Sequence, residues 1–171
     1  MAMKPDRRSF LAALAALAAH AAAARPVPAT AAGQDLTTEE FDLIRSVNTM
    51  RRDRGLQPLT LRRDLSRAAR AYARRMAEEG FFSHHAPDGA GPTDRADAEG
   101  YDWRRLGEAL AAGQPTADET AKSWRDSPGH AKIIFDPDSR HIGVGFWRRR
   151  NLNPKRPTLE RYWVLLAGDT R

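Results

Sequence analysis

Residues 141–147 read HIGVGFW, and the arrangement of the rest of the chain follows from this stretch. The apolar residues Ile142, Val144 and Phe146 alternate with two glycines and a tryptophan. A repeat of two is typical of a strand, and glycines in a strand allow another segment to approach the backbone closely. We therefore predict a strand here that packs tightly against its neighbours.

Helices are predicted before this strand. Thr37 and Glu40 form a capping box at the start of a helix that Gly55 ends, and its apolar residues recur at helical spacing. A second helix is predicted over about 64–79, a short one over 93–99, and another from a capping box at 116–119 to the Ser-Pro-Gly turn at 127–129.

Two further strands are predicted, at 106–112 and at 162–166, and the basic segment before the last one is predicted as a long hairpin loop. Helices that come early, with a few short strands late, favour an α+β fold over a parallel βαβ arrangement. A small antiparallel sheet with helices on both faces is the simplest way to bury these apolar stripes. We expect one such domain over residues 37–169.

Residues 1–31 have the composition of a secretory signal: a basic start, an alanine-rich apolar stretch and small residues at the end. Within it, 6–11 (DRRSFL) resembles a twin-arginine signal. An uncleaved helical anchor is the alternative, but the stretch is short and rich in alanine for a membrane span. The sequence thus predicts a secreted or periplasmic protein.

The charge and the cysteine content exclude two classes of protein. Residues 1–31 hold four basic residues and one acidic residue, so without them the net charge falls from +6 to +3. This removes most of the support for nucleic-acid binding, and we expect no nucleic-acid partner. The chain has no cysteine, so a packed core and not a disulfide framework must hold the fold.

Three residues with reactive side chains stand beside chain-breaking residues that fix the backbone. His84 follows a predicted helix end, Glu108 follows a glycine at the start of a strand, and His130 follows the Ser-Pro-Gly turn. Two imidazoles and a carboxylate can bind one zinc ion, and such an ion could acidify a water molecule. Spacing alone leaves the alternative that the histidines are surface or capping residues.

Five groups of residues carry a resemblance to a known family; they are NxxR with GLxPL (48–59), AxxxAxxM with GFFSH (69–84), GE with AAG (107–113), WxxSPGH (124–130), and HIGVG with YW (141–163). In this order they resemble the bacterial branch of the CAP superfamily, named after cysteine-rich secretory proteins, antigen 5 and pathogenesis-related class 1 proteins. The resemblance runs from about 41 to 168.

The resemblance implies an α/β/α sandwich with a central cleft in which His84, Glu108 and His130 bind a ligand, with or without a divalent metal ion. Three positions depart from the family pattern: Ala109 replaces an asparagine, Ser127 stands where eukaryotic members have a second acid, and Ile133 replaces another asparagine. These departures put a full set of acidic metal ligands in doubt.

Two hypotheses of function remain open at this stage. The first is a binding module whose cleft holds a lipid or a cell-envelope component, in a monomer that could also contact a membrane peripherally through its basic hairpin. The second is a metal-assisted hydrolase in which His84 and His130 hold zinc and Glu108 acts as general base or third ligand. A serine mechanism with Ser127 and His130 is disfavoured, because Ser-Pro-Gly is typical of a helix end.

Overall fold

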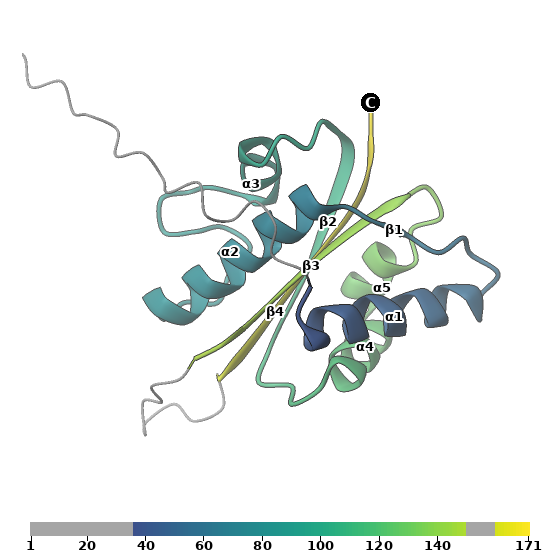
Figure 1. The fold of residues 1–171 in the computed structure, drawn as a ribbon, viewed down its shortest axis with the longest axis horizontal. Coiled ribbons are helices and arrows are strands. Elements are labelled where there is room, and N and C mark those ends of the chain that lie inside the picture. The colour runs from purple at the N-terminus through teal and green to yellow at the C-terminus, as the bar shows by residue number, and fades with distance from the viewer. Residues whose placement is uncertain (1–35, 150–159) are drawn as a thin grey trace, which may run out of the picture. The chain divides into compact units, whose positions relative to one another are not determined.

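The computed structural model describes residues 36–149 and 160–171 (Figure 1). The predicted signal at 1–31 and most of the predicted basic hairpin lie outside these residues. The elements, in chain order, are α1 (Thr38–Arg52), β1 (Thr60–Leu61), α2 (Arg63–Glu79), α3 (Pro92–Ala98), β2 (Trp103–Ala112), α4 (Ala117–Asp126), α5 (Pro128–Ile134), β3 (His141–Arg148) and β4 (Arg161–Thr170).

The four strands form one sheet in the order β1-β3-β4-β2. β4 pairs antiparallel with both β3 and β2, as predicted, whereas the two-residue β1 pairs parallel with β3. The sheet is therefore mixed. A two-residue strand carries no periodic pattern, which is why the sequence indicated only a connector there.

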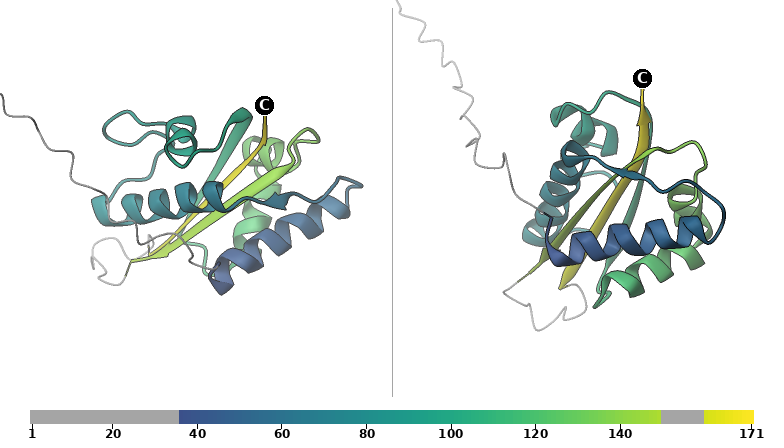
Figure 2. Two further views of the ribbon diagram at one scale, coloured as in Figure 1. Left: turned by 45° about the horizontal axis from the view of Figure 1, so that its top comes forward. Right: turned by 45° about the vertical axis from the view of Figure 1, so that its right-hand side comes forward.

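Helices cover both faces of the sheet, so the α+β fold with an α/β/α sandwich is confirmed (Figure 2). On one face α2 and α3 pack against residues such as Tyr162, Val164 and Leu166. On the other face α1, α4 and α5 pack against Trp163 and Leu165 and their neighbours. The apolar side chains of β4 point alternately into the two clusters, because successive side chains of a strand lie on opposite faces.

The glycines of β3 give α2 its place on the sheet. A β-carbon at Gly143 would lie 2.3 Å from the backbone of Leu65, and one at Gly145 would lie 2.1 Å from the amide nitrogen of Arg70. Both distances are far inside van der Waals contact, so only glycine allows this packing. The close approach predicted from the sequence is confirmed.

The helix ends follow the predicted signals. The Thr37 hydroxyl accepts from the Glu40 N–H, and the Glu40 carboxylate accepts from the Thr37 N–H, which completes the capping box of α1. Gly80 ends α2 in the left-handed conformation, with a φ of 76°. Within the described ranges, no helix is long and apolar enough to cross a membrane.

Candidate functional site

The site starts from a hydrogen bond between His84 and Glu108. His84 lies in the loop after α2, and Glu108 lies in the middle of β2. The Nδ1 atom of His84 is 2.8 Å from Oε1 of Glu108. The imidazole is about half exposed, whereas the carboxylate side chain is only 2% exposed. A buried acid therefore holds an accessible imidazole in one orientation.

Arg95, in α3, occupies the other oxygen of Glu108. Its Nη2 atom donates to Oε2 of Glu108 at 2.6 Å and to the backbone carbonyl of His84 at 3.2 Å. The Arg95 side chain is only 12% exposed, so this ion pair is largely shielded from water. One guanidinium thus balances the buried carboxylate and fixes the loop that carries the histidine.

Tyr72, on the buried face of α2, supports both partners. Its ring lies 3.4 Å below the guanidinium carbon of Arg95, which is a cation–π contact. Its hydroxyl donates to the backbone carbonyl of Ser83 at 2.6 Å, one residue before His84. Neither Arg95 nor Tyr72 was predicted as a site residue, because Tyr72 belongs to the apolar stripe of its helix and no motif marks Arg95.

His130 belongs to the opposite layer of helices. It lies on α5, is half-buried, and its ring is 6.4 Å from the ring of Trp124. Burial lowers the pKa of His130, and the neighbouring His84 lowers it further. Both effects favour the neutral form of the His130 ring.

As arranged, the carboxylate of Glu108 has no oxygen free for a metal ion shared with the two histidines. Glu108 already engages His84 and Arg95 with both oxygens. In the part of the chain that the structure describes, no group of three or more histidine, aspartate or glutamate side chains could hold a metal. A metal ion would have to be held by the imidazoles of His84 and His130, with Glu108 behind His84 as an orienting partner.

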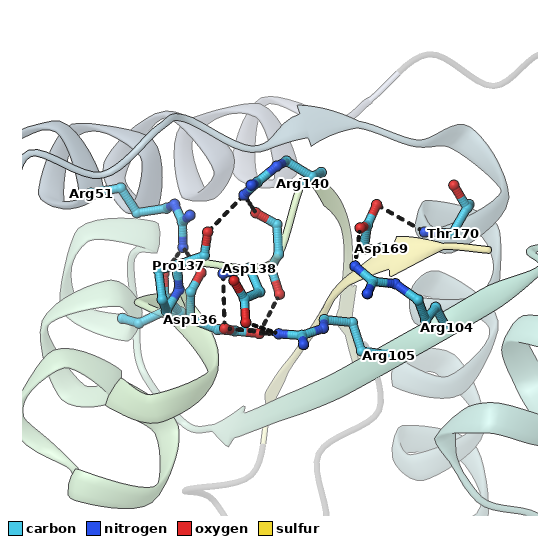
Figure 3. Close-up of polar contacts among 11 residues, drawn as sticks. Arg51, Arg104, Arg105, Asp136, Pro137, Asp138, Arg140, Asp169 and Thr170 are labelled. Carbon is cyan, nitrogen blue, oxygen red and sulfur yellow. Dashed lines mark hydrogen bonds and ion pairs between the residues drawn. The ribbon is translucent and has the colours of Figure 1, made fainter.

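Arg51 fixes the end of the helix that carries His130 (Figure 3). This fully buried side chain donates from Nη1 to the carbonyls of Ile134 and Asp136, at 2.8 and 3.0 Å. Ile134 is the last residue of α5, so Arg51 satisfies a carbonyl that the helix itself leaves free. Arg105 binds the carboxylate of Asp136 and so links the same turn to β2.

The other histidines lie apart from this bond network. His85 is exposed, as predicted. His141 pairs with Gly168 on β4, and its Nδ1 atom is 2.9 Å from the hydroxyl of Tyr101. No hydrogen bond joins Ser127 to His130 within the described residues, so nothing there supports a serine nucleophile.

The structure shows what the departures from the family pattern do. Ala109 is fully buried on the face of the sheet opposite to Glu108, in the cluster that α1 and α4 cover. Ile133 contacts β2 at Gly107, where an added β-carbon would lie 3.0 Å from its methyl group. At both positions, 109 and 133, an apolar side chain therefore packs in the core or against it where the family pattern has an asparagine.

Comparisons with known proteins agree with this architecture. Residues 44–165 match the model of the cysteine-rich secretory protein (CAP) family. The uncharacterized protein YkwD of Bacillus subtilis is 35% identical over 117 residues, which are 68% of this chain and 46% of that protein. The uncharacterized membrane protein YlbC of the same organism is 27% identical over 66% of this chain and 33% of its own length. The chain thus spans less than half the length of either relative.

Solved structures share the fold at lower identity. An outer surface protein of Borrelia burgdorferi superposes with a TM-score of 0.66 at 21% identity, over 81% of this chain and 99% of that one. An extracellular protein with an SCP domain from Bacillus anthracis gives 0.65 at 18% identity, over 81% of this chain and 45% of that one.

Proposed function

Because the chain belongs to the cysteine-rich secretory protein (CAP) family, we propose that it is an exported binding domain. Its ligand, a lipid or another cell-envelope component, binds at His84, Glu108 and His130. Export is supported by the secretory pattern of residues 1–31, and by the names of two structural neighbours, an outer surface protein and an extracellular protein. We propose that the protein acts as a monomer.

The observation that carries this proposal is the pairing of a buried carboxylate with a half-exposed imidazole. Glu108 engages Nδ1 of His84, which leaves Nε2 as the ring nitrogen that can meet a ligand. His130 adds a second imidazole, and its lowered pKa favours the neutral form of that ring. The two imidazoles offer ring nitrogens that can hydrogen bond to a ligand.

NMR titration tests this proposal. The probes are lysophosphatidylglycerol below its micelle-forming concentration and the disaccharide GlcNAc–MurNAc. We expect one probe to shift the ring signals of His84 and His130, and His84→Ala or His130→Ala to weaken that binding about tenfold or more, which is about 1.4 kcal/mol. The control His85→Ala should bind as tightly as the natural protein. Equal loss in all three variants, or no saturable shift with either probe, would contradict the proposal.

A divalent metal ion, with zinc favoured, stays a separate prediction for the same site. Imidazole binds a metal only when neutral, so a zinc-dependent rise in melting temperature should be present at about pH 7.5 and fade near about pH 5. His84→Ala and His130→Ala should each abolish this rise, and His85→Ala should keep it. A melting temperature that responds to neither zinc nor chelator at neutral pH would remove the metal from the proposal.

Hydrolysis is the second candidate, because a carboxylate bonded to an imidazole also suits a general base and its orienting acid. His84, and not Glu108, would then be the base, since both Glu108 oxygens are already engaged. Hydrolysis of p-nitrophenyl acetate that exceeds the buffer rate and is lost in His84→Ala would favour this candidate. An equal rate in the variant would count against it.

A further inference from the structure

We infer that the open edge of β2, beside the imidazoles, takes an extended peptide that adds one strand to the sheet. This inference rests on the proposed function, because it names a chemical class of ligand for the same site. β2 lies at the end of the strand order β1-β3-β4-β2, so in the described part of the chain it pairs on one side only. Its residues 108–111 are nevertheless buried.

The hydrogen bonds around the sheet show which peptide groups face this open edge. Gly168 of β4 accepts from Arg140, on the β3 side, whereas Arg161 of β4 accepts from Gly113, on the β2 side. The peptide N–H and C=O groups of the even-numbered residues of β4 therefore hydrogen bond to β3, and those of the odd-numbered residues hydrogen bond to β2. Since Glu108 is opposite Leu166, the N–H and the C=O of Glu108 both point away from β4.

One contact confirms this direction. Two residues along, Leu110 must face the same open edge, and its C=O accepts from the indole Nε1 of Trp124 at 3.0 Å. A side chain thus caps the edge at Leu110. At Glu108, by contrast, no hydrogen bond among the described residues engages either peptide group, although the residue is only 5% exposed.

Buried peptide groups without a partner are rare in folded proteins, because desolvating them without a hydrogen bond is unfavourable. The N–H and C=O of Glu108 lie side by side and need one donor and one acceptor in return. A residue in an extended chain provides this pair, and this is how strand addition to a sheet edge works.

The charges at the site favour a neutral partner of this kind. The carboxylate of Glu108 is balanced by Arg95 inside the protein, and both side chains are largely buried. An ionic headgroup would find no unbalanced opposite charge among these groups. A peptide backbone is neutral and can also hydrogen bond to the imidazoles beside the edge.

Hydrogen exchange measured by NMR tests the inference, with the neutral peptide acetyl-Thr-Val-Thr-Val-Thr-amide as the probe. With the peptide at about ten times its Kd, exchange of the Glu108 N–H should slow about tenfold, because only the free fraction of the protein exchanges. The N–H of Ala109 is the internal control. It faces β4 already, so its exchange should change little.

Two modified peptides complete the test. A peptide N-methylated at every residue cannot pair with a strand and should give no protection, whereas one methylated only at its valines keeps one pairing edge and should still protect Glu108. Protection by the fully methylated peptide, or no protection by the unmodified one, would overturn the inference. If the unmodified peptide fails while lysophosphatidylglycerol or GlcNAc–MurNAc shifts His84 and His130, the proposed function stands and only the peptide is wrong. If every probe fails, both are wrong.

Discussion

Trp124 joins the core to the candidate site, so its removal should affect both. The side chain is 1% exposed, packs in the cluster between α4 and the sheet, and donates to the carbonyl of Leu110. Deleting a buried aromatic side chain costs about 3–5 kcal/mol, and loss of the indole hydrogen bond contributes about 1 kcal/mol of this. A domain of this size is stable by about 5–15 kcal/mol, so Trp124→Ala should remain folded but lose a large part of its stability.

Urea unfolding followed by circular dichroism measures this loss. Trp124→Phe keeps most of the apolar volume but leaves the Leu110 carbonyl unpaired, so it should cost about 1–3 kcal/mol. The control Phe41→Ala removes a side chain that is 57% exposed and should stay within about 0.5 kcal/mol of the natural protein.

A second readout connects the core to His130. Burial lowers the pKa of His130, and the ring of Trp124 is one of the groups beside it. Loss of the indole admits water, so NMR titration should show the pKa of His130 rising toward its ordinary value of about 6.5 in Trp124→Ala. If both the urea midpoint and the pKa of His130 match the natural protein, α4 does not position the site as we argue.

Three other perturbations follow from contacts elsewhere in the domain. Gly143→Ala places a β-carbon 2.3 Å from Leu65, so it should destabilise the protein by at least about 1–3 kcal/mol in thermal unfolding; unchanged stability would refute the close contact of α2 with β3. Arg51→Met leaves the carbonyls of the α5 end unpaired and should cost about 2–4 kcal/mol in urea, and a variant as stable as the natural protein would show that these bonds do not hold the helix. The pKa values of His130 and His141 are lowered, chiefly by burial, so the unfolded chain binds more protons and stability should fall as pH drops below about 6.5. Replacing both histidines by glutamine should flatten this pH dependence, and an equally steep dependence in the double variant would assign it to other groups.

Part of the candidate site could be predicted from the sequence, because chain-breaking residues mark it. His84 follows the glycine that ends α2, and Glu108 lies on a strand recognisable by its apolar pattern. The hydrogen bond between His84 and Glu108 shows that these two residues lie together, as predicted. The metal-ligand role given to Glu108 stays a prediction, and its contact with Arg95 could not be foreseen.

The sequence by itself determined the elements whose signals are local. Capping boxes, terminal glycines and the alternation at 141–147 act over a few residues, so they hold whatever the rest of the chain does. The strands are longer than predicted, and α5 begins where the sequence predicts only a turn, because the ends of elements and a seven-residue helix carry weak signals.

Only the tertiary structure decided which groups meet at the site. Arg95 and Glu108 are 13 residues apart in the chain, and His84 and Glu108 are 24 apart. No local pattern fixes such pairs, because they depend on how α3 and the loop after α2 pack over β2. The open edge of β2 arises in the same way: hydrogen bonds to β4 engage one side of the strand, and the fold leaves the other side of Glu108 without a partner among the described residues.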